Sequence, residues 1–156
     1  MKLYLVRHGD STPALDDDKR PLSEKGTKDI TRLAKFISPL NITVSRIIHS
    51  KKFRAKQTAD ILSASIATKL PGQARAELDP MNSIIPIIDE IYAQDEDLML
   101  VGHMPFMGKL AARLITGDEN KDIVAFKTGC MICLERMAAN SWIINWVLYP
   151  ELCRVD

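Results

Sequence analysis

Four side chains that could handle a phosphoryl group stand just after apolar segments of the sequence. Arg7 and His8 follow the run LYLV. Arg54 comes shortly after SRIIHS, and His103 directly follows LMLVG. Arginine is always charged and presents a planar fork that matches phosphate oxygens two at a time. Histidine can be a neutral nucleophile near pH 7. These residue types indicate transfer of a phosphoryl group to an imidazole nitrogen.

The elements around these residues decide whether they can meet. Strand-like apolar runs alternate with segments of helical periodicity, which is typical of an α/β domain with a mostly parallel sheet. Ligands of such sheets bind outside the carboxyl ends of the strands. We therefore expect a shared site if the strands at 3–6, 45–50 and 97–102 are neighbours. Singly, each of the four residues is more often structural, and it is their joint placement that favours a site.

The remaining elements follow from periodicity and from capping residues. Ser23 is the expected N-cap of a helix that stops before Pro39. The other helices are predicted over 53–66, over 83–93 with Pro86 in its first turn, and over 105–117. A further strand is possible at 74–78, and an antiparallel edge hairpin is expected from 130–136 and 142–149. With no repeat or linker, residues 1–156 are expected to form one domain.

Two backbone features support an anion site at the strand ends. Gly9 is expected to let the chain turn tightly beside the anion. Arg54 lies near the start of a predicted helix, where free N–H groups and the helix dipole favour negative charge.

Four blocks of the sequence resemble, in order, the motifs of the histidine phosphatase superfamily, also called phosphoglycerate mutase-like. LVRHGDS carries an R-H-G signature and RPLSEKG is similar to R-P-L-T/S-x-x-G. SKKFRAKQTADIL resembles S-P-x-x-R-A-x-Q-T-A, and LVGHMPFM resembles V-G-H-N-P. The blocks run from residue 3 to about 107, and the length matches the compact phosphohistidine phosphatase branch, called SixA. The resemblance implies a three-layer sandwich, with helices flanking the central sheet.

The resemblance also implies a role for each matched position. His8 would be the nucleophile that becomes phosphohistidine. Arg7, Arg54 and His103 would hold the phosphoryl oxygens. Arg20, in the R-P-L block, would lie near the mouth of the site and contact phosphate. No metal or cofactor would be required, because the arginines supply positive charge.

The general acid is left open by the sequence. Glu77 and Asp79 lie in about the right region, and Asp10 directly follows the R-H-G signature. Larger members of the family use a glutamate to protonate the leaving group, whereas the compact branch lacks an obvious equivalent. A phosphohistidine substrate leaves through a weak P–N bond and needs less help from an acid, which typically contributes ~10²–10⁴-fold. Lys51 and Met104 replace the usual proline and asparagine of the motifs, but neither change removes a charge.

We therefore expect a phosphatase that acts on phosphohistidine in a phosphorylated protein, such as a histidine-containing phosphotransfer domain. One alternative is a phosphatase of small phosphate esters, either sugar or nucleotide phosphates. Another is a phosphate-binding module without turnover. The sequence has no large insertion that would build a lid, which favours a shallow site and, as substrate, a protein surface or a small exposed phosphate ester.

Composition excludes several other classes. The 156 residues carry 21 basic and 20 acidic side chains, a formal net charge of +1, which gives no support for nucleic-acid or membrane-surface binding. No stretch approaches the ~20 apolar residues of a membrane span. No signal peptide is recognised, so a cytoplasmic location is expected.

Some residues that attract attention have simpler interpretations. Cys130 and Cys133 form a C-x-x-C within a predicted strand, so they should point to opposite faces as small buried hydrophobes. Together with Cys153 they give an odd number of cysteines and no zinc set. His49 is expected in the core or behind the site. The run 16–18, three aspartates, is expected to be solvated and paired with Lys19 or Arg20 rather than to bind metal. A further possibility is that these aspartates shape selectivity by repelling small, highly charged anions.

Overall fold

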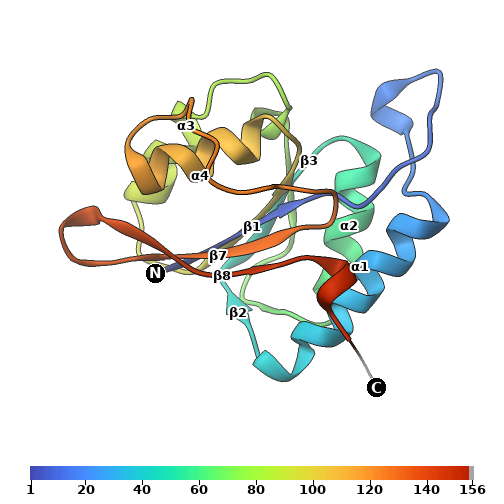
Figure 1. Ribbon diagram of the computed structural model, residues 1–156, viewed down its shortest axis with the longest axis horizontal. Coiled ribbons are helices and arrows are strands. Elements are labelled where there is room, and N and C mark those ends of the chain that lie inside the picture. Colours follow the sequence, from blue (N-terminus) through green and yellow to red (C-terminus); the bar gives the residue numbers. More distant parts are fainter. Residues whose placement is uncertain (155–156) are drawn as a thin grey trace.

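The computed structural model describes residues 1–154 and is built on one six-stranded sheet (Figure 1). The strand order is β5-β3-β6-β1-β7-β8, and β2 and β4 form a separate two-stranded sheet. The strands are β1 (Lys2–Arg7), β2 (Thr43–Val44), β3 (Arg46–Ser50), β4 (Ala67–Thr68), β5 (Gln73–Arg75), β6 (Leu98–Gly102), β7 (Met131–Arg136) and β8 (Trp142–Leu148).

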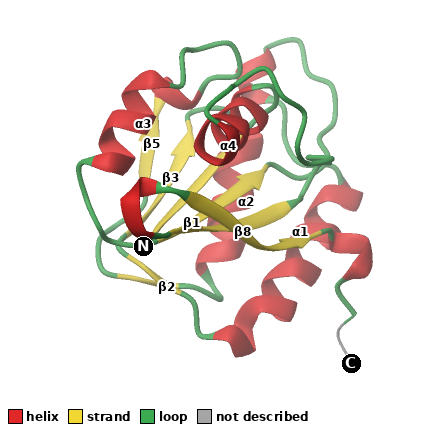
Figure 2. Ribbon diagram, turned by 60° about the vertical axis from the view of Figure 1, so that its left-hand side comes forward, coloured by secondary structure: helices red, strands yellow, loops and turns green. Residues whose placement is uncertain are grey.

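Four α-helices cover the two faces of the sheet (Figure 2). They are α1 (Glu24–Ile37), α2 (Phe53–Ser63), α3 (Ile85–Tyr92) and α4 (Phe106–Thr116). Residues 1–154 also contain five short 3₁₀ helices. Four lie in the connections, namely η1 (Asp17–Lys19), η2 (Ser38–Leu40), η3 (Ala76–Leu78) and η4 (Ala138–Asn140), and η5 (Pro150–Leu152) follows β8.

Each face of the sheet has its own hydrophobic core. Along β1, Leu3 and Leu5 pack with α3 and α4, whereas Tyr4 and Val6 pack with α1 and α2. This alternation follows from the two-residue period of a strand. It explains why β1 is apolar throughout, since both of its faces are buried. The predicted three-layer α/β architecture is confirmed.

Local signals in the sequence begin and end the helices as expected. Ser23 caps α1, because its Oγ accepts a hydrogen bond of 2.9 Å from the backbone N–H of Gly26. Pro86 lies in the first turn of α3. Gly117 ends α4 with φ of +79°, a left-handed conformation that glycine adopts without strain.

Strand register aligns the ends that carry the candidate residues. β6 lies between β1 and β3 and is parallel to both. Arg7 pairs with Gly102, so His8 and His103 come level just after the ends of adjacent strands, and the backbone N–H of His8 donates to the carbonyl of Gly102 at 2.9 Å. The three strands expected to be neighbours are neighbours.

Two predicted elements differ in extent. The helix expected over 53–66 ends at Ser63, because the chain turns there and Ile66 enters the α1–α2 core from non-helical backbone just before β4. Of the possible strand at 74–78, only Ala74 and Arg75 pair with β3; the next three residues form η3, which buries Leu78 completely.

The C-terminal hairpin is confirmed: β7 and β8 are antiparallel, with β8 at the edge of the sheet. Cys130 and Cys133 are buried thiols in the opposite cores, as their spacing predicted. His49 is buried as well. Within residues 1–154, no helix has the length and apolar character needed to cross a membrane.

Candidate active site

His8 stands directly after β1 with one ring nitrogen already engaged. Its Nδ1 lies 2.6 Å from the carbonyl oxygen of Gly9, so we assign the proton to Nδ1 and the free lone pair to Nε2. Burial lowers the pKa of His8 to about 4, with further lowering from the charges of Arg54, Arg7 and Arg20. The imidazole is therefore neutral near pH 7, with Nε2 available as a nucleophile.

His103 lies beside His8 at the end of β6. The two ring centroids are 4.9 Å apart, and Nε2 of His103 is 2.8 Å from Oγ of Ser50, the last residue of β3. Burial lowers the pKa of His103 to about 3, helped by the proximity of His8. Its Nδ1 is buried without a hydrogen-bond partner among residues 1–154, and buried polar atoms usually have one. A ligand oxygen could supply that partner.

Three arginines approach the histidine pair from different elements. Arg54, in the first turn of α2, is 5% exposed, and its Nη1 donates to the backbone oxygen of Asp17 at 2.9 Å. Nη1 of Arg7 donates to the carbonyl of Phe126 at 2.8 Å, and burial lowers the pKa of this guanidinium. Arg20 donates through Nη2 to Oγ of Ser11 at 2.9 Å.

The structure thus brings the predicted cations close enough to act on one imidazole. Arg7, Arg20 and Arg54 each lower the pKa of His8 by their charge, although burial has the larger effect. The enclosure of the ring was not visible in the sequence. The N-cap of α2, Lys52, makes no capping hydrogen bond with its side chain, so the helix start remains suited to an anion.

The three candidate acids lie in different surroundings. Asp10 accepts a hydrogen bond of 2.6 Å from Oγ of Ser23 at the start of α1. Glu77 is exposed and pairs with Arg75 at 3.5 Å; its pKa is lowered, first by a backbone hydrogen bond and then by this pairing, which opposes a role as proton donor.

Asp79 is the candidate with a connection to the histidine pair. Its Oδ1 lies 3.5 Å from Oγ of Ser50, the same hydroxyl that contacts His103. Of the three candidate acids, the geometry favours Asp79.

Gln57 and Thr58, the Q-T of the block SKKFRAKQTADIL, join the loops of the site by hydrogen bonds. Their residue types alone did not reveal this role. Oγ1 of Thr58 accepts from the backbone N–H of Gly9 at 3.1 Å and donates to the carbonyl of Arg54 at 2.8 Å. Oε1 of Gln57 accepts from the backbone N–H of Leu22 at 2.7 Å. The available signal was their position three and four residues after Arg54, on the same helix.

The glycines of the motifs permit close packing. Gly9 does not have a positive φ and residues 8–10 form no turn, so the tight turn expected at Gly9 is absent. A Cβ there would lie 2.9 Å from a side-chain carbon of Ile30, and one on Gly26 would lie 2.0 Å from the backbone oxygen of Asp10. The two glycines let the start of α1 pack directly against the chain that follows His8.

The aspartate run 16–18 makes ion pairs. Asp16 pairs with Lys19 at 3.6 Å and Asp17 with Arg20 at 3.3 Å, which confirms the predicted pairing. The part of the chain that the structure describes contains no group of three or more metal-ligating side chains placed to share an ion.

Comparison with known proteins gives the family. A model of the histidine phosphatase superfamily (branch 1) matches residues 3–84. An uncharacterised protein of Picosynechococcus sp. is 32% identical over 136 residues, 83% of this chain and 82% of the relative. Phosphohistidine phosphatase SixA of Escherichia coli strain K12 is 22% identical over 155 residues, 96% of this chain and 94% of that protein.

Solved structures share the fold. The protein histidine phosphatase SixA, complexed with tungstate, has a TM-score of 0.85 at 22% identity, over 96% of this chain and 97% of that one. A mycobacterial glucosyl-3-phosphoglycerate phosphatase, complexed with VO₃, has a TM-score of 0.69 at 16% identity, over 92% and 96%. The family model spans more than half of the chain and includes the R-H-G, R-P-L and Q-T blocks, so the chain belongs to the histidine phosphatase superfamily and is a phosphatase.

Proposed function

We propose that this phosphatase removes the phosphoryl group from phosphohistidine in another protein, with His8 as the nucleophile. The observation that carries the proposal is the hydrogen bond between Nδ1 of His8 and the carbonyl of Gly9 at 2.6 Å. It fixes the tautomer and leaves Nε2 as the reactive atom. The three arginines whose charges act on the ring then provide the field that a transferring phosphoryl group requires.

In the first step, Nε2 of His8 attacks phosphorus in line with the leaving nitrogen. The P–N bond of the substrate breaks, and its electron pair returns to the substrate imidazole. The phosphorylated His8 ring carries a positive charge, which its Nδ1–H shares with the Gly9 carbonyl. Arg7, Arg54 and His103 hold the three equatorial oxygens, whose charge persists through the transition state.

In the second step, water attacks the phosphorus of phosphorylated His8. The bond from phosphorus to Nε2 breaks, its electron pair restores the neutral imidazole, and inorganic phosphate leaves. The proton lost by water goes to phosphate or to a nearby base, for which Asp79 is the candidate connected to the site through Ser50.

A phosphohistidine substrate suits what surrounds His8. Of the three candidate acids, two are engaged elsewhere, and a departing imidazole needs little protonation. Residues 12–19, in the segment that supplies Asp17 to Arg54, are exposed and can border a protein surface. The full-length likeness to phosphohistidine phosphatase SixA supports the same substrate.

A phosphatase of small phosphate esters is the second candidate. The observation that favours it is the shared fold of the mycobacterial glucosyl-3-phosphoglycerate phosphatase, whose name places its substrate among small sugar phosphates. An ester oxygen is a poorer leaving group than imidazole, so this reaction would depend more strongly on an acid such as Asp79.

A substrate panel separates these functions. A phosphorylated histidine phosphotransfer domain should be hydrolysed with a higher kcat/KM than sugar, nucleotide or aryl phosphates. A preference for a sugar or nucleotide phosphate would support the second candidate. Saturable phosphate binding without turnover of any substrate would identify a binding module.

Substitution of the histidines tests the nucleophile. His8→Asn retains a donor for the Gly9 carbonyl but has no nucleophilic nitrogen, so turnover should fall by at least ~10³-fold and acid-labile, alkali-stable labelling of the protein should disappear. His49→Asn is the matched control, because His49 also contacts a carbonyl through Nδ1, that of Ser50 at 2.9 Å. Wild-type turnover by His8→Asn would refute the mechanism.

A further inference from the structure

Asp17 is the point at which three cations of the site converge. Its Oδ2 lies 2.8 Å from Nζ of Lys52 and 3.5 Å from Nη2 of Arg54, and its Oδ1 lies 3.3 Å from Nη1 of Arg20. Its backbone oxygen accepts a further hydrogen bond of 2.9 Å from Nη1 of Arg54. Both terminal nitrogens of that guanidinium therefore contact Asp17.

These contacts resemble those of a bound oxyanion. The Asp17 carboxylate presents two negatively charged oxygens to cations from the start of α2 and from the R-P-L block, as a phosphoryl group would. The hydrogen bond from Lys52, with the nearby charge of Arg54, lowers the pKa of Asp17 to about 2, so the carboxylate stays charged over the whole working range. The Arg54 side chain is only 6% exposed, which makes a compensating anion valuable to it.

Little packing holds Asp17 in its place. It begins the three-residue helix η1 within an exposed segment, residues 12–19, and its own side chain is 56% exposed. No buried apolar residue of η1 would have to leave the core if the carboxylate withdrew. The contact is thus strong in charge but weakly anchored by packing.

Its neighbour Asp18 provides a natural comparison. The Asp18 carboxylate lies 2.6 Å from Nζ of Lys52, and within residues 1–154 it has no ion pair with an arginine. The side chain is 71% exposed. Removing either carboxylate changes the net charge equally, but only Asp17 lies against Arg54.

We propose that Asp17 determines specificity as an internal anion that competes with the phosphoryl group for Arg54. This inference rests on the proposed function, because that function defines where the phosphoryl group lies. Free phosphate and small phosphate esters must displace the carboxylate, or tolerate its negative charge, using only the contacts of the phosphate itself. A phosphorylated protein gains further contacts outside the cation cluster and can offset that cost. Asp17 therefore selects against small anions and limits inhibition by the product.

Calorimetric binding of inorganic phosphate to the whole protein tests this inference directly. Asp17→Asn should bind phosphate about 10- to 100-fold more tightly than wild type, because it removes the competing charge while keeping a similar shape. The gain should shrink as salt is raised. Asp18→Asn should change the affinity by less than about 3-fold, and Asp17→Glu should retain the weak binding of wild type.

Kinetics of an aryl phosphate supply a second readout. Asp17→Asn should lower KM for the aryl ester and lower the inhibition constant of phosphate by similar factors, while Asp18→Asn should do neither. Equal or weaker phosphate binding by Asp17→Asn would overturn the proposal and indicate that Asp17 only orients Arg54. An equal gain with Asp18→Asn would overturn it too, because net charge would then suffice.

The phosphate titration does not depend on turnover, so the two proposals fail separately. If no phosphorylated substrate is hydrolysed but Asp17→Asn binds phosphate more tightly, the proposed function fails and the competing anion stands. If phosphohistidine is hydrolysed and Asp17→Asn leaves phosphate binding unchanged, the reverse holds.

Discussion

His8 and His103 are kept neutral at the cost of stability in acid. Burial is the main reason that their pKa values fall to about 4 and about 3, against an ordinary value of 6.5. In the unfolded chain both rings would take up a proton as the pH falls through 6.5, whereas the folded protein resists until lower pH. The unfolded state then binds more protons, so stability is full above pH 6.5 and is lost toward pH 3.

Unfolding by urea between pH 7.5 and 4.5 measures this effect. The free energy of unfolding should fall with acid, with a limit of roughly 1.4 kcal/mol for each unit of pKa difference. His8→Asn should show a shallower fall, since it removes one of the two titrating rings. Identical pH slopes for wild type and His8→Asn would mean that the folded His8 titrates normally.

Arg54 should contribute to phosphate binding through hydrogen bonds to a charged group. Arg54→Ala should cost roughly 1.5–3 kcal/mol, equivalent to about a 10- to 150-fold fall in kcat/KM. Arg113→Ala is a suitable control, because Arg113 is exposed at the end of α4 and bonds only the nearby Gly117 carbonyl among the described residues. Kinetics indistinguishable from wild type would remove Arg54 from the site.

At the scale of elements, α1 is held against the chain after His8 by the absence of a side chain at Gly26. Alanine there would place its Cβ 2.0 Å from the backbone oxygen of Asp10. The resulting shift should cost about 1–3 kcal/mol or more, exceeding the gain of ~1 kcal/mol in helix propensity. Denaturant unfolding should show a clear loss of stability for Gly26→Ala.

Gly108 in α4 provides the matched substitution. Its added Cβ would meet only the end of the flexible Met104 side chain, at 2.6 Å from the terminal methyl. Gly108→Ala should therefore be close to neutral or slightly stabilising. Equal stability of the two variants would show that the contact between Gly26 and Asp10 is not tight in solution.

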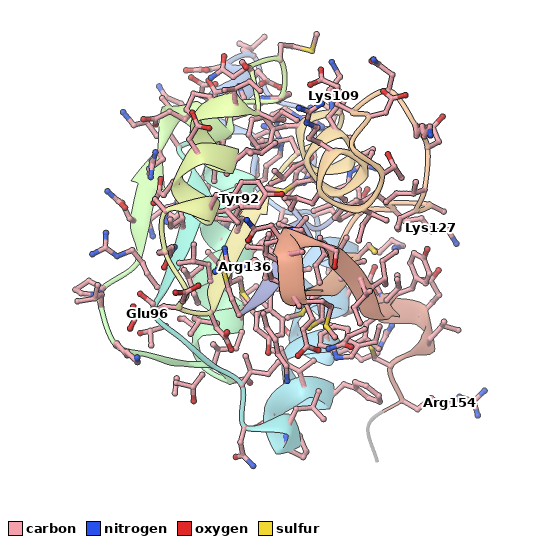
Figure 3. The ribbon with its side chains drawn as sticks, turned by 90° about the vertical axis from the view of Figure 1, so that its left-hand side faces the viewer. Tyr92, Glu96, Lys109, Lys127, Arg136 and Arg154 are labelled. Carbon is pink, nitrogen blue, oxygen red and sulfur yellow. The ribbon has the colours of Figure 1, made fainter. Side chains whose placement is uncertain are left out.

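At the end of the sheet opposite the candidate site, Arg136 connects β7 to the end of α3. Figure 3 shows Arg136 of β7 near Tyr92, the last residue of α3. Its guanidinium donates to the carbonyl of Ile91 at 3.3 Å and to that of Gln94 at 2.6 Å, so it caps the helix end. The backbone N–H of Arg136 donates to the carbonyl of Met1, which places it at the amino end of β1, far along the strand from His8.

Arg136→Ala should separate stability from catalysis. Loss of the two hydrogen bonds to the helix end, together with the ion pair between Arg136 and Asp95, should reduce the free energy of unfolding by roughly 1–3 kcal/mol. The value of kcat at a temperature where the variant is folded should equal that of wild type. A tenfold change in kcat would show that the two ends of the sheet are coupled.

At the scale of the whole molecule, the sequence predicted those elements whose burial leaves a periodic pattern of apolar residues. The apolar runs and capping residues placed five of the six strands of the main sheet and all four α-helices, because burial on two faces and helix caps leave clear patterns. The exception is β5, a short edge strand for which the sequence offered only a possible strand at 74–78. Strands of two residues such as β2 left no pattern. For the run 16–18 the sequence indicated ion pairs with Lys19 or Arg20 and a possible repulsion of small anions, but not the contact of Asp17 with Arg54, since an exposed loop without periodicity does not reveal which distant cation it meets.

The candidate site likewise combines features that the sequence predicted with features that only the structure reveals. His8, His103 and Arg54 were predictable because strand ends of a parallel sheet converge. The contact between Ser50 and His103 depends on the register of β3 with β6, and the tie between Thr58 and Gly9 depends on how α2 docks. Register and docking arise from the sum of many weak contacts, which single residue types do not report.

The position of β6 between β1 and β3 has a consequence for any shortened version of this protein. β6 is synthesised after β1 and β3, and it lies between these two strands and forms hydrogen bonds with both. A polypeptide cut before Leu98 would carry Arg7, His8 and Arg54, yet its two main strands would have a gap between them. If the missing part is supplied as a separate peptide, the sheet and the phosphatase activity should be restored together or remain absent together.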